Sequence, residues 1–293
     1  MIHPTEPNTA ELMAPFAHCS GYQPQAIDTS IESDRYQFQL LRQKTPGERF
    51  AIAAKMIRWA KTVSLRGMKK ARGDLAPEYF AKAVLQEKWI PLLTPTGNAT
   101  MWIQDPGEIA RILHSIFESL NIPYYVTGGV CAIAYGDPRT TRDLDVVVEV
   151  ERSNITPMVD QLDAAGFYCP PSAVEDIQSG RARTLSVTHR QLILNADIVL
   201  NDDTAFDRSK MARRRLEAIG LDESERFWLA SPEDLILAKL LWGRQSQSEK
   251  QWRDVLGILK VQGDSLEFAY LTQWAEHLDL IELLDQAMRE AGS

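Results

Sequence analysis

The stretch Tyr124–Val150, YYVTGGVCAIAYGDPRTTRDLDVVVEV, decides the fold. Its first four residues predict a short strand, and Gly128 and Gly129 predict a turn. The apolar run Val130–Tyr135 then predicts a short helix closed by Gly136, and Asp143–Val150 predicts a second strand. A strand, a glycine turn, a helix and a returning strand indicate an α+β fold. Two acidic residues inside the second, otherwise apolar strand need an explanation.

Asp143 and Asp145 have to share one face of that strand, because successive side chains point to opposite faces. Their Cα atoms are expected about 6.5 to 7 Å apart at a strand rise of about 3.3 Å per residue. Two neighbouring carboxylates repel each other, and burying them without a partner costs several kcal/mol. A divalent cation removes this cost, and hard oxygen ligands suit Mg²⁺ or Mn²⁺. The pair therefore predicts a metal site.

The two glycines fit chemistry at phosphorus. A Gly-Gly turn before a helix lets backbone N–H groups approach a phosphate, because no Cβ stands in the way. Thirteen residues lie between Gly129 and Asp143, enough for one short helix and a return. The glycines and the aspartates are therefore predicted side by side at one sheet edge, with the glycines cradling a triphosphate.

The pattern GG followed by R-x-T-x-D-x-D in PRTTRDLDVVV resembles the nucleotidyltransferase superfamily. It is most similar to the minimal nucleotidyltransferases related to abortive-infection-type toxins of bacterial toxin-antitoxin systems. The resemblance covers roughly residues 106–260. It implies an α+β fold with a mixed sheet packed by helices, an NTP donor such as ATP, and Mg²⁺ or Mn²⁺. It also implies a third metal-binding carboxylate, matched by Asp197 in LILNADIVL.

By the same resemblance, Asp143, Asp145 and Asp197 are the catalytic and metal-binding residues. The implied nucleotide-binding residues are Thr127, Gly128, Gly129, Arg139, Thr141 and Lys239. Weaker candidates for a phosphate contact are Arg244, Lys250 and Asp254. Many members have Gly-Ser where this chain has Gly128-Gly129, and Thr127 is the candidate to replace part of the missing hydroxyl. Cys131 and Ala132 stand where enzymes that add CCA to tRNA have charged residues, which argues against CCA addition.

The chain is predicted to have three parts: a flexible tail at 1–34, a basic helical module at 35–98, and a nucleotidyltransferase-like domain with C-terminal helices at 99–293. In TPGE, Thr45 and Glu48 predict a capping box, and the apolar stripe Ile52, Met56, Trp59 and Val63 predicts an amphipathic helix. DPGE predicts a second helix start with Asp105 as N-cap. Pro91–Asn98 predicts a linker.

Charge is unevenly distributed along the 293 residues. Residues 35–88 carry 13 basic and four acidic side chains, a net charge of +9, whereas the whole chain has -8. This asymmetry suggests either contact with nucleic acid through residues 35–88 or docking of two parts of the chain by charge. No apolar run reaches the length of a membrane span, and the N-terminus lacks a secretory pattern, so the expected location is the cytoplasm. The three cysteines are expected to be free thiols.

The leading hypothesis is a Mg²⁺-dependent nucleotidyltransferase that moves a nucleoside monophosphate from an NTP to an acceptor hydroxyl and has a part in a toxin-antitoxin system. The acceptor stays open among a tRNA, a protein and a small molecule. The alternative is a catalytically idle module of the same fold with a binding or regulatory role. A third hypothesis is a basic helical nucleic-acid binder with an accessory domain.

Overall fold

The structure, a computed structural model, describes residues 21–73, 77–85, 99–219, 225–246 and 248–292. Seven strands of these residues form one sheet in the order β3-β4-β5-β2-β1-β7-β6. Their bounds are β1 Tyr124–Thr127, β2 Asp143–Val148, β3 Phe167–Tyr168, β4 Thr184–His189, β5 Leu194–Leu200, β6 Arg215–Ala218 and β7 Arg226–Leu229. β2 pairs in parallel with β5 but antiparallel with β1. The predicted α+β fold with a mixed sheet is confirmed.

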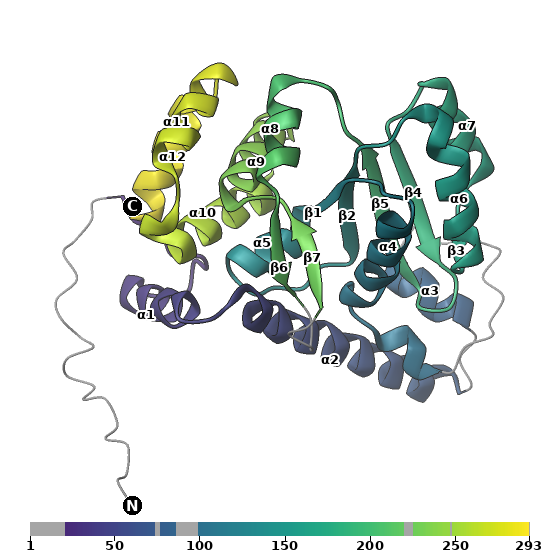
Figure 1. Cartoon of the computed structure of the whole chain (residues 1–293). Coiled ribbons are helices and arrows are strands. Elements are labelled where there is room, and N and C mark those ends of the chain that lie inside the picture. Colours follow the sequence, from purple (N-terminus) through teal and green to yellow (C-terminus); the bar gives the residue numbers. More distant parts are fainter. Residues whose placement is uncertain (1–20, 74–76, 86–98, 220–224, 247, 293) are drawn as a thin grey trace, which may run out of the picture.

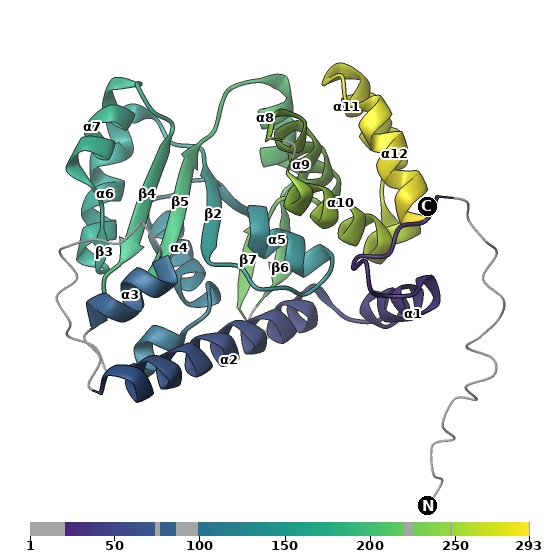
Figure 2. The same ribbon diagram turned by 180° about the vertical axis from the view of Figure 1, so that it is seen from behind.

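Helices cover both faces of this sheet (Figures 1 and 2), with α4 on one face and α5 on the other. The helices after the N-terminal part are α4 Gly107–Ser119, α5 Gly128–Tyr135, α6 Ile155–Ala164, α7 Pro171–Ser179, α8 Ala205–Arg213, α9 Pro232–Ser246, α10 Glu249–Gln262, α11 Phe268–His277 and α12 Ile281–Ala291. α5 contacts α9 and α10, and α4 contacts α6. The side chains of β2 alternate in burial. Leu144, Val146 and Val148 on one face are fully buried, while the odd positions on the other face are half-buried. None of the helices within the described ranges combines the length and apolar character needed to cross a bilayer.

The N-terminal helices are α1 Ile31–Arg42, α2 Pro46–Arg72 and α3 Pro77–Leu85, followed by a short 3-10 helix at Ala99–Ile103. Part of the expected flexible tail is ordered, because Asp34 on α1 is only 1% exposed. Its carboxylate accepts hydrogen bonds from the Tyr22 hydroxyl at 2.6 Å and from Lys260 Nζ at 2.8 Å. Residues 21–34 thus pack against α10. The rest of the expected tail, residues 1–20, and the expected linker Pro91–Asn98 lie outside the described residues.

The capping box of α2 is confirmed, since the Thr45 hydroxyl and the Glu48 carboxylate each accept a backbone N–H of the other residue. The predicted apolar stripe is not the buried face: Met56, Trp59 and Val63 are 42%, 70% and 48% exposed. Phe50, Ala53, Ala54 and Ile57 are buried instead. The first three of these four belong to the main hydrophobic core, so α2 is built into the same core as the sheet.

Asp105 is not the N-cap of α4, because the helix begins at Gly107 with Pro106 in the capping position. Asp105 instead accepts the Gly107 N–H on one carboxylate oxygen at 2.9 Å. Its other oxygen pairs with Arg58 of α2. The carboxylate therefore ties α2 to the start of α4.

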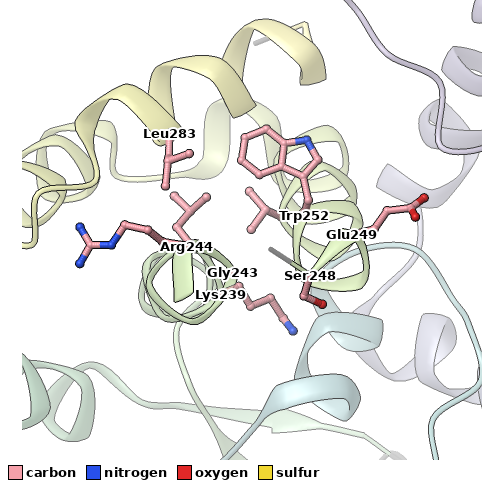
Figure 3. Close-up of a pocket in the computed structure, with 9 residues that line it drawn as sticks. Lys239, Gly243, Arg244, Ser248, Glu249, Trp252 and Leu283 are labelled. Atoms are coloured by element: carbon pink, nitrogen blue, oxygen red, sulfur yellow. The ribbon is translucent and has the colours of Figure 1, made fainter. Parts of the chain in front are cut away.

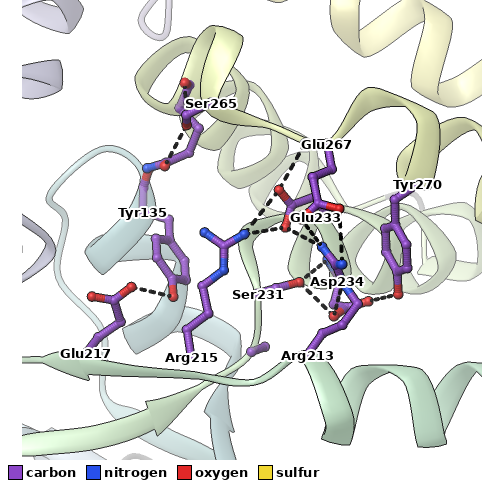
Figure 4. Close-up of polar contacts among 12 residues, drawn as sticks. Tyr135, Arg213, Arg215, Glu217, Ser231, Glu233, Asp234, Ser265, Glu267 and Tyr270 are labelled. Atoms are coloured by element: carbon purple, nitrogen blue, oxygen red, sulfur yellow. Dashed lines mark hydrogen bonds and ion pairs between the residues drawn. The ribbon is translucent and has the colours of Figure 1, made fainter.

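A buried group of charged side chains holds the start of α9 (Figure 4). Glu233 and Asp234 are fully buried, and the Ser231 hydroxyl caps the helix by accepting the Asp234 N–H at 3.1 Å. Arg213 and Arg215 donate to Glu233 at 3.3 and 3.2 Å. Because these arginines flank the start of β6, the group joins the sheet edge to the helix that carries Lys239.

Candidate metal and nucleotide site

Three carboxylates lie on two adjacent parallel strands. Asp143 and Asp145 are on β2, Asp197 is on β5, and the strand register pairs Asp145 directly with Asp197. Residues paired in a sheet show the same face, so all three side chains face the same side of the sheet. Ser186 on β4, which pairs with Asp197 on its other side, donates its hydroxyl to Asp197 Oδ1 at 2.5 Å. The structure therefore brings the three sequence-predicted carboxylates together.

Gly128 makes the close approach of Asp145 possible. It has φ +62°, and a Cβ placed on it would lie 1.8 Å from Asp145 Oδ2, closer than any two non-bonded atoms can come. Gly128 and Gly129 are the first two residues of α5, not a separate turn, and the Gly129 N–H donates to the Asp145 carboxylate. One of the N–H groups expected to cradle phosphate is thus already directed at Asp145. Thr127 caps α5 through its backbone and pairs with Asp145 across β1 and β2.

Gly129 lies against Thr141. A Cβ on Gly129 would be 2.5 Å from Thr141 Oγ1 and 3.2 Å from Thr141 Cβ. Thr141 is a buried polar residue, only 9% exposed. The space beside position 129 is therefore already filled by the hydroxyl of Thr141, which comes from the loop before β2.

Arg139 and Lys239 both bind one carboxylate, Asp254 on α10. Arg139 makes a bidentate pair with it, with Nε to Oδ1 and Nη2 to Oδ2 both at 2.7 Å. Lys239 Nζ donates to Asp254 Oδ2 at 2.7 Å and to Gln251 Oε1 at 2.9 Å. The sequence resemblance implies that Asp254 is a weak candidate for a phosphate contact. In the structure, the negative charge of Asp254 instead orients Arg139 and Lys239, the two predicted phosphate-binding cations.

Electrostatic interactions connect the three strand carboxylates with the group formed by Arg139, Lys239 and Asp254. Burial raises the pKa of Asp145, and the negative charges of Asp197 and Asp143 raise it further, while Lys239 opposes the shift. Burial likewise lowers the pKa of Lys239, against the pull of Asp254. Burial alone would raise the pKa of Asp254, but hydrogen bonds and charge from Arg139 and Lys239 outweigh it and leave that pKa below its usual value. The charge of Lys239 therefore partly offsets the repulsion among the carboxylates around Asp145.

The donor set suits a divalent cation by its chemistry. Three carboxylates supply the hard oxygen ligands that Mg²⁺ and Mn²⁺ prefer, and their mutual repulsion raises the pKa of Asp145. Within the described ranges, however, no three His, Cys, Asp or Glu side chains approach closely enough to form a ready metal cluster. Hydrogen bonds from Gly129 to Asp145 and from Ser186 to Asp197 hold two of these carboxylates. Metal binding would have to exchange such contacts for metal coordination.

Two cavities flank the Lys239–Asp254 pair. One, of about 400 Å³, lies between α9, α10 and α12 and is walled by Leu240, Trp252 and Leu283 (Figure 3). Lys239 and Arg244 both line it, and the guanidinium of Arg244 donates to the Asp279 carbonyl at 2.8 Å. The second, of about 380 Å³, is lined by Arg139, Asp254 and Lys250 among others. Of the three weaker candidates, Asp254 thus joins the site, Lys250 lies at its rim, and Arg244 is tied elsewhere.

Two residues of this site were not assigned their present roles from sequence. Ser186 follows no motif, and only its pairing with Asp197 on the neighbouring strand reveals it. Asp254 is 115 residues from Arg139, and its sequence context, KQWRDVLGIL, signals a helix but no partner.

Comparison with known proteins gives fold likenesses only. No family model matches the chain, and no curated protein shows a significant match. An antigenic nucleotidyltransferase-like protein from Paracoccidioides brasiliensis is 18% identical, with 63% of this chain and 91% of that one covered and a TM-score of 0.40. The lincosamide antibiotic adenylyltransferase LnuA, bound to lincomycin, is 14% identical over 53% of this chain and 97% of that one, with a TM-score of 0.38.

A third similar structure is ANT(2″)-Ia in complex with adenylyl-2″-tobramycin. It is 12% identical over 59% of this chain and 95% of that one, with a TM-score of 0.42. Because TM-scores under 0.5 mark limited agreement between backbones, these likenesses leave the function to be argued from the residues of the site.

Proposed function

We propose that the protein is a metal-dependent nucleotidyltransferase that moves a nucleoside monophosphate from an NTP to an acceptor hydroxyl. The observation that carries the proposal is the register of β2 and β5, which sets Asp145 beside Asp197 with Asp143 on the same face. The start of α5 and the cations Arg139 and Lys239 adjoin these carboxylates. Carboxylates for a metal beside donors for phosphate are the parts that transfer at phosphorus requires.

The residues divide the work as follows. Asp143, Asp145 and Asp197 would hold Mg²⁺ or Mn²⁺, which supplies positive charge to the donor phosphates and favours the deprotonated acceptor oxygen. Gly128 keeps the backbone clear of Asp145, and the positive end of α5 attracts the triphosphate. Arg139 and Lys239, oriented by Asp254, would offset the negative charge that develops as pyrophosphate leaves. The hydroxyl of Thr141 would donate to a phosphate oxygen in the place of the serine that this chain lacks.

The second candidate is the idle binding or regulatory module. Two features favour it: residue 129 has no hydroxyl, and Asp254 already pairs with both Arg139 and Lys239 and offsets part of their charge. A part in a toxin-antitoxin pair and the acceptor's identity, whether tRNA, protein or small molecule, stay predictions of the sequence resemblance.

Incubation with α-labelled NTPs, Mg²⁺ and a cell extract tests the transfer proposal. The wild-type protein should label an acceptor, and Asp143→Asn with Asp145→Asn should lower labelling by at least about 100-fold, because several kcal/mol of charge stabilisation is lost. Asp202→Asn with Asp203→Asn is the matched control, since it removes two charges from exposed residues of the loop after β5. Labelling at the wild-type rate by the first double variant would overturn the assignment.

Metal binding without turnover separates the two candidates. Titration of Mn²⁺, followed by the electron paramagnetic resonance of the free ion, should show a bound fraction in wild type and in the control pair. The Asp143→Asn, Asp145→Asn protein should bind much less. A protein that binds Mn²⁺ and NTP yet labels nothing in any extract would favour the idle module.

A further inference from the structure

The long helix α2 carries a concentration of positive charge that the main core does not use. Between Arg49 and Arg72 the chain has eight basic residues and no acidic residue, within a protein of net charge -8. Three of the eight are committed to the fold. Arg49 donates to the Ala134 carbonyl at 2.7 Å, Arg58 pairs with Asp105, and Lys61 Nζ donates to the Gln104 carbonyl at 2.7 Å. The other five are exposed: Lys55, Arg66, Lys69, Lys70 and Arg72.

Exposed cations and exposed apolar side chains share one side of this helix. At 100° per residue, Lys55, Trp59, Arg66 and Lys70 fall within an arc of about 60°, and Met56 and Val63 border it. Trp59 is 70% exposed and lies along the helix between Lys55 and the pair Arg66 and Lys70. From residue 55 to residue 70 the surface is about 22 Å long. We call it the α2 outer face and define it as Lys55, Met56, Trp59, Val63, Arg66 and Lys70.

The inner side of α2 accounts for the stability of the helix, so the outer face is not needed for packing. Phe50, Ala53 and Ala54 enter the main core, and Leu65 packs with Phe80 and Ile193 in a smaller cluster. Both ribbon views place α2 along the periphery of the molecule (Figures 1 and 2). An exposed tryptophan beside exposed lysine and arginine side chains therefore suits a partner that has both negative charge and a flat apolar surface.

We propose that the α2 outer face binds single-stranded nucleic acid, with Lys55, Arg66 and Lys70 contacting phosphates and Trp59 stacking on an unpaired base. Phosphates complement the exposed positive charge, and they give binding a strong dependence on salt. An aromatic ring needs a base that is free of its own stack, which a single strand offers and a duplex does not. The apolar residues of this face number three and are bordered by Lys55 and Arg66, which makes the face too narrow to insert into a lipid surface.

The inner side of this helix reaches the sheet end that carries the candidate site. Ile193, which packs against Leu65 of α2, precedes Asp197 by four residues, about 13 Å at strand spacing. Binding at the outer face does not require the carboxylates, so it can be tested apart from transfer. A strand held on α2 would lie on the flank of the protein that borders β5.

Fluorescence anisotropy of a labelled single strand of about 12 nucleotides, a length within the site sizes of single-strand binders, tests the proposal in EDTA. RNA and DNA of the same sequence form two arms, and the corresponding duplex forms a third. Wild type should bind a single strand and lose affinity by about 20-fold between 50 and 200 mM salt if three phosphates are contacted. Trp59→Ala should weaken binding by about 5-fold or more at constant salt.

Charge variants locate the surface. Lys55→Gln, Arg66→Gln and Lys70→Gln together should weaken binding by at least about 10-fold and flatten its salt dependence. The matched control is Arg181→Gln, Arg208→Gln and Arg226→Gln, which removes the same charge from exposed residues elsewhere. Asp143→Asn with Asp145→Asn should bind like wild type, so a failure of the transfer proposal leaves this result intact.

Four outcomes would overturn the inference: no binding of either single strand at 50 mM salt, equal losses in both triple variants, tighter binding of the duplex, or an unchanged affinity in Trp59→Ala. Binding to vesicles of phosphatidylcholine and phosphatidylserine in preference to oligonucleotides would also reject it. Circular dichroism of each variant shows whether the helix content is retained, which the exposure of the substituted side chains predicts for Trp59→Ala and for both triple variants.

Discussion

The absence of a Cβ at Gly129 leaves room for the hydroxyl of Thr141. Many proteins that the sequence resembles carry serine at this position, but here its Cβ would meet Thr141 Oγ1 at 2.5 Å. Serine and Thr141 therefore exclude each other in this backbone. The chain lacks the expected serine for a steric reason, and Thr141 provides an oxygen in the same neighbourhood.

Gly129→Ser should accordingly lower the free energy of unfolding by about 1–3 kcal/mol, as overpacking does, and should not raise labelling. Adding Thr141→Ala should restore most of the lost stability, because it removes the atoms that clash. Urea denaturation of the two single variants and the double variant measures the coupling. A Gly129→Ser protein as stable as wild type would show that Thr141 moves aside freely.

Asp145 is held in an unfavourable environment when no metal is added. Burial and the charges of Asp197 and Asp143 raise its folded-state pKa above the unfolded value, so its ionised form costs stability at neutral pH. Asp145→Asn should therefore be more stable than wild type in EDTA at pH 7. The difference should shrink as pH falls through the raised pKa and vanish below the unfolded pKa of about 3.9.

Thermal denaturation at several pH values measures this difference. Added Mn²⁺ should reverse the order, since it stabilises only a protein whose carboxylates can bind it. Asp202→Asn serves as the control for loss of one exposed carboxylate. A wild-type protein more stable than Asp145→Asn in EDTA at pH 7 would contradict the described strain.

At the level of helices and strands, buried ion pairs decide how α9 is placed. Glu233 is fully buried and contacts two arginines that flank the start of β6. Glu233→Ala should lower the free energy of unfolding by about 3–5 kcal/mol, because it removes a buried carboxylate that pairs with both arginines and leaves Arg213 with Glu267 as its closest acidic partner. Glu225→Ala, which breaks the more exposed pair with Arg111, should cost about 1 kcal/mol or less. Similar losses in urea denaturation of the two variants would argue against this role of Glu233.

The elements that could be predicted from sequence are those with a local signal. Alternation and glycines located β1, α5 and β2, and the capping residue Thr45 located the start of α2. β6, with the sequence RLEA, has no such local signal. It is a strand because it pairs with β7, and that pairing cannot be read from the local sequence. The apolar stripe of α2 misled for a similar reason: small residues such as Ala53 and Ala54 allow close packing, so they form the buried side.

For the molecule as a whole, contacts between residues far apart in sequence complete the site and attach the N-terminal helices. The three carboxylates could be predicted from a motif and a strand pattern, but the clamp of Asp254 on Arg139 could not. The same holds for Asp34 and Lys260, which are 226 residues apart and both 1% exposed. Such pairs depend on the complete packing and leave no trace in local sequence.

Lys260→Ala should free α1 from α10, since it leaves the buried carboxylate of Asp34 without its cation, a loss worth about 3–5 kcal/mol. Hydrogen exchange should become faster in α1 and in residues 21–30 but stay slow in β1 and β2. Arg244→Ala, whose partner Asp279 is fully exposed, is the control. Uniformly faster exchange through the whole sheet would instead mean that the pair supports global stability.

The clamp between Arg139 and Asp254 also limits how the gene could be divided. A fragment ending after β5 would hold all three carboxylates and both glycines, yet its Arg139 would have neither Asp254 nor Lys239 beside it. A fragment starting at α8 would hold Asp254 and Lys239 without Arg139 or the three carboxylates. Neither half could then assemble the site alone, so the pair of fragments forms a natural design for a complementation reporter.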